Sequence, residues 1–158
     1  MEDKAKYFME QAIKLAGENI TTNEGGPFGA VIVKDGQIIA YGKNLVIATN
    51  DPTAHAEIVA IRQACQRLST FQLHDCDIYT SCEPCPMCLG AIYWAKLAKV
   101  YYANTKQQAA HIGFNDDFIY QEMAILLTQR TIPFIHLPDD MAKWVFEQWI
   151  AKSDKIFY

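Results

Sequence analysis

Two short segments far apart in the chain, His55-Ala56-Glu57 and Pro84-Cys85-Pro86-Met87-Cys88, restrict its fold more than any other feature. Zinc in proteins takes four tetrahedral ligands, drawn mainly from thiolate and imidazole groups. Cys85 and Cys88 are three residues apart, so they share one face of a first helical turn. His55 supplies a third ligand only if the fold brings the two segments together. The sequence therefore predicts a domain in which two helix starts meet at one metal ion.

Three protein ligands leave one position on the metal for water, and an open position is typical of catalytic rather than structural zinc sites. Glu57 lies two residues after His55. Two side chains at this spacing point about 200° apart in the middle of a helix. In the first turn of a helix, however, both side chains can reach a metal ion that lies beyond the helix end. We expect His55, Cys85 and Cys88 to bind one Zn²⁺ per subunit, and Glu57 to act as general acid and base on a zinc-activated water.

Cys82 leaves an alternative open, because Cys82, Cys85 and Cys88 repeat at three-residue intervals. Together with His55 they would form a closed Cys₃His site, which would stabilise a non-catalytic binding module and have no use for Glu57. We place Cys82 in the turn before the helix and favour the catalytic interpretation. The odd total of five cysteines argues against a disulfide framework, and the remaining two are interpreted as buried thiols.

The rest of the pattern predicts alternating helices and strands. Helices are expected at about 3–17, 54–66, 84–96, 118–127 and 138–152, and strands at 28–34, 37–43, 77–81, 99–103 and 132–137. Asp35-Gly36 predicts a two-residue hairpin turn, Thr53 is the expected cap of the second helix, and 104–116 is interpreted as a loop. This order predicts one α/β domain over 1–158. Its architecture is a three-layer α/β/α sandwich, with a five-stranded mixed sheet that begins with a hairpin and is mostly parallel beyond it.

Composition argues against two classes of partner. The net charge is −4, from 14 Lys and Arg against 18 Asp and Glu, with no block of like charges. A nucleic-acid-binding protein usually carries a basic face, so no nucleic-acid partner is expected. No apolar run approaches the roughly 20 residues that cross a bilayer, and the charged N-terminus lacks the pattern of a secretory signal. We expect a cytoplasmic protein without a membrane partner.

The motif residues resemble those of the cytidine/deoxycytidylate deaminase superfamily, in which an H-x-E segment and a P-C-x-x-C segment form the zinc site. Within it, tRNA adenosine deaminases and bacterial guanine deaminases share this pattern. Further segments resemble the guanine deaminases: GGPFGAVIV at 25–33, NDPT at 50–53, GFNDD at 113–117 and the aromatic chain end Phe157-Tyr158. The resemblance covers nearly the whole chain and implies a cytidine deaminase-like fold.

The resemblance also implies contacts to a purine base. Asn44, at the end of the second hairpin strand, would bind the base, and Phe28 would pack against its ring. Ala56 would contact the base from within the H-A-E segment. Two of these residues have a plainer interpretation, with Asn44 ending a strand and Phe28 belonging to the core.

Three residues nearer the C-terminus are implied to complete the pocket. Asp116 would hydrogen-bond guanine near its amine and share in proton transfer, and a register error of one residue would move this role to Asp117. As an alternative, Asp116 caps the helix that follows it. Trp94 would line the pocket or belong to the core. Tyr158 would close the pocket, either in its own subunit or in a partner.

Together these residues imply hydrolytic deamination of guanine to xanthine and ammonia. Deamination of adenosine in tRNA is the first alternative, and guanosine, cytosine and ammeline are further small substrates. The C-terminal segment carries more apolar residues than one helix face needs, among them Trp144, Phe146 and Trp149. We expect a homodimer in which a segment of about 139–158 is exchanged between subunits.

Overall fold

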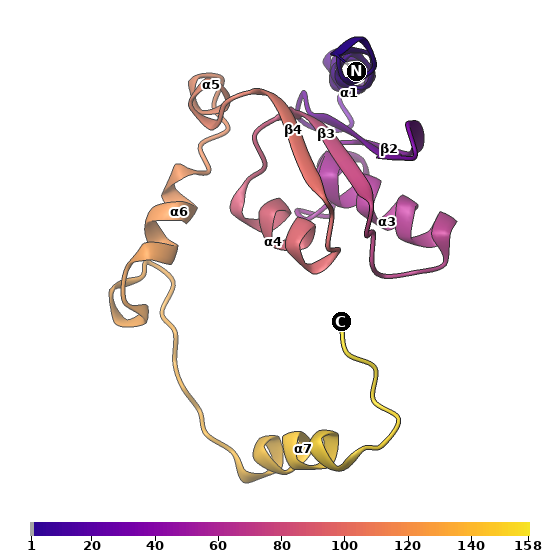
Figure 1. Ribbon diagram of the computed structural model, residues 1–158. Helices are drawn as coiled ribbons and strands as arrows, with labels where there is room; N and C mark the ends of the chain where they lie inside the picture. Colours follow the sequence, from indigo (N-terminus) through magenta and orange to yellow (C-terminus); the bar gives the residue numbers. More distant parts are fainter. Residues whose placement is uncertain (1) are drawn as a thin grey trace. The chain divides into compact units, whose positions relative to one another are not determined.

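The computed structural model describes residues 2–158, and the chain divides after Phe118 into two compact units. The elements of the first unit are α1 (Glu2–Thr22), β1 (Gly29–Lys34), β2 (Gln37–Lys43), α2 (Val46–Thr49), α3 (Ala56–Leu68), β3 (Cys76–Cys82), α4 (Pro86–Trp94), β4 (Lys99–Asn104) and α5 (Lys106–His111). Helix α6 (Asp117–Ala124) crosses the division, and η1 (Leu127–Gln129) and α7 (Asp140–Ala151) follow in the second unit (Figure 1).

The four strands form a mixed sheet in the order β2-β1-β3-β4. β1 is antiparallel to both β2 and β3, and β3 is parallel to β4. The predicted hairpin is confirmed, since the β1–β2 ladder closes with Lys34 opposite Gln37 around the turn Asp35-Gly36. The expectation of mostly parallel pairing beyond the hairpin is wrong at β3. The crossover through α3 makes β3 parallel to β2, but β1 lies between them and faces β3 in the opposite direction.

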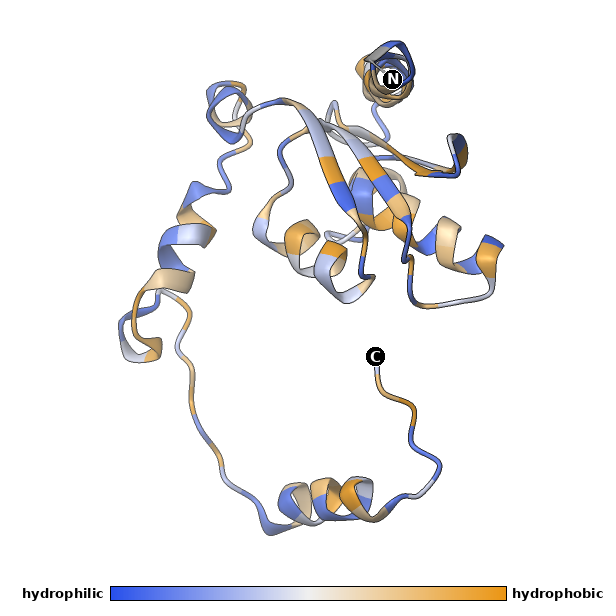
Figure 2. Cartoon of the chain, viewed as in Figure 1, coloured by the Kyte–Doolittle hydropathy of each residue, from blue (hydrophilic) through white to orange (hydrophobic). Residues whose placement is uncertain are grey.

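Helices cover both faces of this sheet and make three layers, as predicted. α1 packs on one face, and α3, with α4 beside it, covers the other (Figure 1). The residues of β1 alternate between two cores: Ala30 and Ile32 face α3, whereas Val31 and Val33 pack with Phe8 of α1. A strand buried on both faces needs a nearly continuous apolar run, which β1 has at 29–33, whereas Figure 2 shows hydrophobic and polar residues interspersed along β3 and β4.

The first turn of α3 approaches the sheet closely at Gly42 of β2. A Cβ atom at this position would lie 2.1 Å from the Ala56 carbonyl oxygen and 2.7 Å from the Ala60 nitrogen. No side chain fits into that space, so Gly42 allows the start of α3 to rest against the strand. This contact bears on function, because α3 begins directly after His55 and carries Glu57 in its first turn.

Two expectations about helices are corrected. The N-cap of α3 is His55 rather than Thr53, because the Thr53 hydroxyl instead donates to Asp51 Oδ1 (2.7 Å). The expected loop at 104–116 contains α5, which begins with a capping box between Thr105 and Gln108. A threonine followed three residues later by glutamine is a helix-start signal that sequence reasoning overlooked here.

The expected fifth strand at 132–137 is not formed, so the sheet has four strands rather than five. A β-rich run becomes a strand only when its backbone N–H and C=O groups pair with a neighbouring strand. In the described part of the chain no strand pairs with 132–137. β4 is therefore the last strand on its side of the sheet, with Tyr102 49% exposed.

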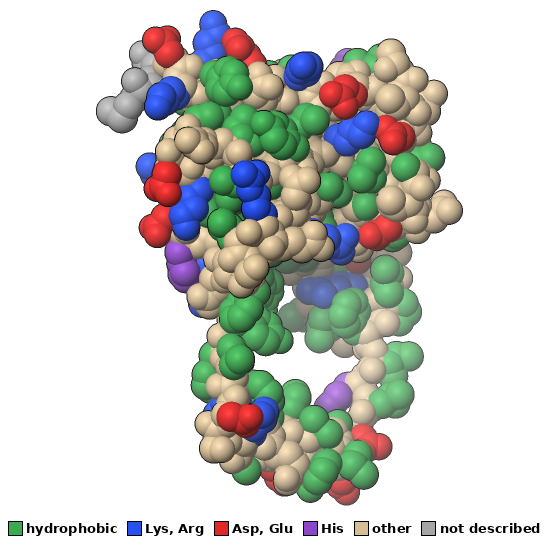
Figure 3. Space-filling model, turned by 90° about the vertical axis from the view of Figure 1, so that its right-hand side faces the viewer, with side chains coloured by type: hydrophobic (Ala, Val, Ile, Leu, Met, Phe, Trp, Pro, Cys, Tyr) green, Lys and Arg blue, Asp and Glu red, His purple; other side chains and the backbone are tan. Residues whose placement is uncertain are grey.

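The second unit, Ile119–Tyr158, leaves most of its large apolar side chains exposed (Figure 3). α7 begins after Asp139, whose side chain accepts a hydrogen bond from the Met141 N–H (2.7 Å). Leu137, Phe146 and Ile150 are between 72% and 82% exposed. An exposed apolar surface of this kind is typical of an interaction site. None of the described helices is both long and apolar enough to span a membrane.

Candidate active site

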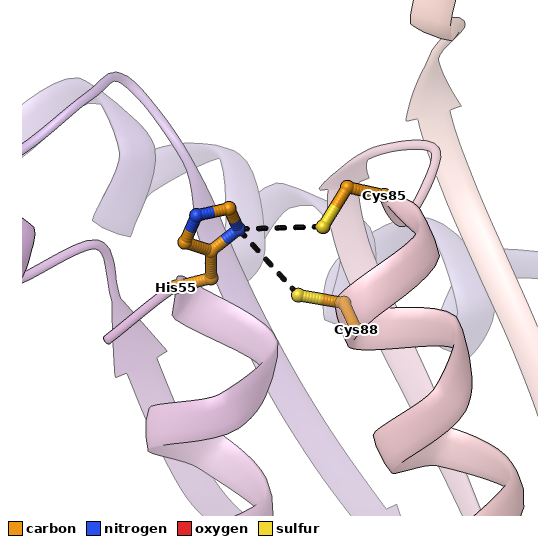
Figure 4. A group of neighbouring side chains, drawn as sticks. All are labelled: His55, Cys85 and Cys88. Atoms are coloured by element: carbon orange, nitrogen blue, oxygen red, sulfur yellow. Dashed lines mark hydrogen bonds between the residues drawn. The ribbon is translucent and has the colours of Figure 1, made fainter. Parts of the chain in front are cut away.

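The two motif segments lie at the starts of neighbouring helices. His55 is the N-cap of α3 and Cys85 the N-cap of α4, both with extended backbone, and Cys88 lies in the first turn of α4. Pro86 occupies the first position of α4, where its fixed φ suits a helix and its missing N–H would have no helical acceptor. The three side chains point toward one another (Figure 4). The local sequence signals thus place all three candidate ligands at helix ends.

The spacing of the three ligand atoms fits a zinc ion. His55 Nδ1 lies 3.5 Å from Cys85 Sγ and 3.6 Å from Cys88 Sγ, and all three ligand atoms lie within 4.8 Å of one another. A tetrahedral zinc with ordinary bond lengths places an imidazole nitrogen about 3.6 Å from a thiolate sulfur. The residues therefore suit zinc without rearrangement, and the histidine presents Nδ1 rather than Nε2.

The two thiols are coupled through a hydrogen bond that shifts their pKa values in opposite directions. A hydrogen bond from Cys88, together with His55, lowers the pKa of Cys85 to about 4. The same hydrogen bond and burial raise the pKa of Cys88, and the hydrogen bond with Cys85 raises the pKa of His55. The shared hydrogen bond thus favours one thiolate in this pair, and both thiols must be deprotonated when a metal binds.

Glu57 lies next to the cluster but does not belong to it. Its side chain is only 6% exposed, and burial raises the pKa of its carboxyl group. The charge of Cys85 raises this pKa further and the charge of His55 lowers it, so the carboxyl group is within electrostatic reach of both ligands. A carboxyl group whose pKa moves toward neutrality exchanges protons more effectively as a general acid and base.

Backbone hydrogen bonds bring Asn44 and Phe28 close to the metal ligands. The Asn44 N–H donates to the Phe28 carbonyl oxygen (3.0 Å), and the Leu45 N–H donates to the Ala54 carbonyl oxygen (2.9 Å). Ala54 directly precedes His55, so the end of β2 runs beside the segment that carries the first ligand. Asn44 is also buried. The structure therefore gathers both predicted base contacts on the His55 side of the site.

Asp116 and Asp117 differ in a way that sequence alone did not decide. One carboxylate oxygen of Asp116, Oδ1, is buried and has no hydrogen-bond partner among the described residues. Burial raises the pKa of Asp116, and its charge contributes to the raised pKa of His55. Asp117 is exposed, and its N–H donates to Asn115 Oδ1 (3.2 Å). Asp116 is therefore the aspartate that lies within reach of the metal ligands.

The remaining predicted residues lie in different places. Ala56 is fully buried between His55 and Glu57. Trp94 is the last residue of α4, at the opposite end of that helix from Cys85, and is 64% exposed. Tyr158 belongs to the second unit. Within the first unit the structure thus brings Ala56 to the metal centre and leaves Trp94 at the far end of α4.

Cys82 is not part of the metal cluster. It ends β3, and its thiol donates to the Thr105 carbonyl oxygen (3.6 Å). Burial raises the pKa of this thiol to about 11, which disfavours the thiolate that a metal ligand must become. Among the described residues the cluster contains His55, Cys85 and Cys88 alone. The closed Cys₃His alternative is therefore not formed.

Two residues near the site were missed by sequence reasoning. The Phe114 ring packs edge-on against Phe28, with centroids 4.9 Å apart, and its place in the GFNDD segment was the available signal. Asn19, in the last turns of α1, is buried and hydrogen-bonded to the carbonyl oxygens of Gly26 and Asn44. No local sequence signal identified Asn19, because the two carbonyl oxygens to which it donates lie outside its own helix.

Residues 2–104 match the family described as the cytidine and deoxycytidylate deaminase zinc-binding region. This range contains the three clustered ligands and Glu57. The chain belongs to the cytidine and deoxycytidylate deaminase family and is a zinc-dependent deaminase, as the two motif segments predicted.

Individual relatives show which deaminases of this family the chain resembles. The guanine deaminase of Bacillus subtilis (strain 168) is 54% identical over 151 residues, which cover 96% of this chain and 97% of that protein. An X-ray structure of guanine deaminase from Bacillus subtilis is similar at a TM-score of 0.94 and 52% identity, over 97% of this chain and 98% of the other. The tRNA-specific adenosine deaminase of Aquifex aeolicus (strain VF5) is 42% identical over 98 residues, 62% of this chain and 64% of that protein. The similarity to the Bacillus subtilis guanine deaminase is thus higher in identity and covers more of the chain than the similarity to the Aquifex aeolicus tRNA enzyme.

Proposed function

We propose that this protein hydrolyses guanine to xanthine and ammonia. The observation that carries the proposal is the buried Oδ1 of Asp116, which has no hydrogen-bond partner among the described residues. An unsatisfied buried acceptor is destabilising unless a ligand supplies a donor. Guanine offers N–H donors on its amine and its ring, and similarity over nearly the full length to a guanine deaminase supports the same substrate.

The catalytic step divides between the metal and Glu57. His55, Cys85 and Cys88 would hold one zinc ion per subunit, and a zinc ion held there would lower the pKa of a water molecule and so supply the nucleophile. Glu57 takes a proton from the attacking water and delivers it to the ring nitrogen beside C2. The proton of the new hydroxyl group then passes to the amine through Asp116 or Glu57, and the C2–N bond breaks to release ammonia.

The base is held by residues on both sides of the metal centre. Asn44 binds the guanine ring edge through its amide, and Phe28, braced by Phe114, packs against the ring. Ala56 contributes the wall between His55 and Glu57, where the N–H groups of a first helical turn have no helical acceptor. Asp116 accepts from the N–H donors of guanine and orients the amine for departure.

Asp116→Asn should lower kcat/KM for guanine on the order of 10²-fold, because a hydrogen bond to a charged acceptor is lost at a buried site. Asp117→Asn is the matched control, since Asp117 is exposed, and it should stay within a few-fold of wild type. The measurement is steady-state ammonia release at saturating zinc. A larger loss in Asp117→Asn than in Asp116→Asn would move the role to the neighbouring residue.

The substrate itself is tested by ammonia release from zinc-loaded protein on guanine, guanosine, adenine, cytosine, cytidine and ammeline. We expect turnover of guanine well above all others. Turnover of none of these compounds, with zinc bound and the fold intact, would contradict the proposal and favour adenosine in tRNA. A tRNA substrate would also give binding that weakens steeply with salt, which a chain of net charge −4 is not expected to show.

The working form is proposed to be a homodimer that exchanges a C-terminal segment of about 139–158. The large apolar side chains of the second unit are exposed, and β4 offers an unpaired edge. Trp94 lies at the far end of α4 from the metal ligands of its own chain, so it lines the guanine pocket, and Tyr158 closes it, only through this assembly. Both are largely exposed, as residues that complete a site on assembly would be. Sedimentation equilibrium should give twice the 17.9 kDa chain mass, and a monomer at micromolar concentration would contradict the proposal.

We place the reaction in the cytoplasm. All five cysteines are free thiols, and the two that bind zinc must stay reduced to do so. The cytosol keeps thiols reduced, whereas oxidising compartments favour disulfides. Cell fractionation that recovered the deaminase outside the cytosolic fraction would contradict this placement.

A further inference from the structure

We propose that Asn19 is a positioning residue for guanine binding, one that holds Asn44 and the loop before Phe28 in the geometry that the base requires. This inference rests on the proposed function, in which Asn44 and Phe28 contact guanine. Asn19 itself lies on α1 and acts through the backbone of these two segments rather than through the substrate.

The Asn19 amide connects three separate parts of the first unit. It lies near the end of α1 and is 4% exposed. Its Nδ2 donates to the Gly26 carbonyl oxygen (2.9 Å) and to the Asn44 carbonyl oxygen (2.7 Å). Gly26 lies in the loop that enters β1, and Asn44 follows the last residue of β2. One side chain therefore ties the entrance of the hairpin to its exit.

The chemistry of the site requires an amide at this position. Both N–H groups of Nδ2 are used, one on each carbonyl oxygen, and Oδ1 accepts from the Thr22 hydroxyl (3.2 Å). The two carbonyl oxygens can only accept, so they fix which end of the amide carries the donors. Aspartate has the same shape but no N–H to donate. An aliphatic side chain would leave two carbonyl oxygens without this donor in a buried place.

The contacts of Asn44 explain why a small displacement would reach the substrate. Its side-chain Oδ1 accepts from the Val46 N–H (3.2 Å), which leaves the donor end of the amide, Nδ2, for the base. The backbone of Gly25 lies directly against the same side chain, since a Cβ atom there would be 2.2 Å from Asn44 Oδ1. The loop and the base-binding amide therefore move together, and Asn19 holds both.

Gly26 links Asn19 to the aromatic wall as well. A Cβ atom on Gly26 would lie 2.9 Å from ring carbons of both Phe28 and Phe114. The two rings pack on this glycine, whose carbonyl oxygen Asn19 holds. Loss of the Asn19 amide would release the support of the Phe28 ring and of Asn44 at once. The zinc ligands would keep their places, because none of them contacts Asn19 through these hydrogen bonds.

The first test compares Asn19→Ala with Thr21→Ala in zinc-loaded protein, using guanine as substrate. Thr21 lies on the same helix end, is exposed, and donates to the Glu18 carbonyl oxygen (3.0 Å). Asn19→Ala should raise KM for guanine on the order of 10-fold, with kcat changed less than KM and zinc content unchanged. Thr21→Ala should leave both constants within about twofold. Asn19→Asp, which keeps the shape and loses the donors, is the second variant if alanine prevents folding.

A double-mutant cycle with Asn44→Ala separates positioning from a general loss of stability. If Asn19 acts through Asn44 as well as through Phe28, Asn19→Ala should raise KM by a smaller factor in the Asn44→Ala background than in the wild type. Independent, multiplying effects would overturn the inference. An unchanged KM in both Asn19 variants, with a raised KM in Asn44→Ala, would also overturn it but leave the proposed function intact. An unchanged KM in Asn44→Ala would instead show that Asn44 does not bind guanine. The inference about Asn19 would then be wrong as well.

Discussion

Glu57→Gln should keep its zinc and lose nearly all turnover of guanine. The substitution preserves the shape of a side chain that is 6% exposed, so the metal cluster should remain intact. It removes the carboxyl group that we propose takes the proton from water and returns it to the substrate. General acid–base catalysis contributes about 10²–10⁴-fold to rate, and kcat should fall by at least the lower value. Zinc content by atomic absorption and ammonia release are measured on the same preparation.

Glu83→Gln is the matched control for this experiment. Glu83 follows Cys82 and accepts from the Lys106 N–H (3.1 Å) through Oε2, a hydrogen bond that glutamine can also accept. This variant should retain kcat within a few-fold. If Glu57→Gln stayed within tenfold of wild type while binding zinc, the proton-transfer role of Glu57 would be wrong.

Replacing either Cys85 or Cys88 by serine should remove zinc and, with it, activity. Both sulfur atoms lie within 3.6 Å of His55 Nδ1, and the three ligands together form the cluster. A site with two remaining protein ligands binds zinc weakly, because each thiolate supplies a strong bond that a hydroxyl group does not replace. We expect less than about one tenth of the wild-type zinc content after dialysis, and turnover at background.

Cys82→Ser distinguishes the catalytic site from a closed structural one. Its thiol donates to the Thr105 carbonyl oxygen and takes no part in the cluster, so full zinc and near-normal turnover are expected. Loss of zinc in Cys82→Ser would indicate a fourth protein ligand and argue against an open, catalytic position. Full zinc in both Cys85→Ser and Cys88→Ser would place the ligands elsewhere.

The metal centre was accessible from sequence because its geometry is mostly local. A three-residue spacing sets Cys85 and Cys88 on one helical face, and the proline between them marks the helix start. His55 and Glu57 reach the same point because α3 also begins there. The hairpin at Asp35-Gly36 was equally local, since a two-residue turn specifies its own closing pair.

The fifth strand shows where local pattern fails. Residues 132–137 have the composition of a strand, but a strand exists only as a partner in a ladder, and the composition of one segment does not name that partner. The direction of β3 relative to β1 was missed for a similar reason. The relative direction of β1 and β3 depends on the order of strands in the sheet, because β1 lies between β2 and β3. The order of strands is a property of the whole sheet.

The sequence by itself therefore determined the deaminase class, the layered α/β architecture and the cluster of His55, Cys85 and Cys88, because each depends on spacing within a turn of helix or on the order of elements. Only the tertiary structure decided that Asp116 rather than Asp117 has a buried oxygen within electrostatic reach of His55. It also decided that Asn19 joins the loop at Gly26 to Asn44. Adjacent residues in a chain often point to opposite sides, and residues far apart meet only through packing. The roles of Asp116 and Asn19 therefore depend on tertiary contacts, and these contacts cannot be predicted from the local sequence.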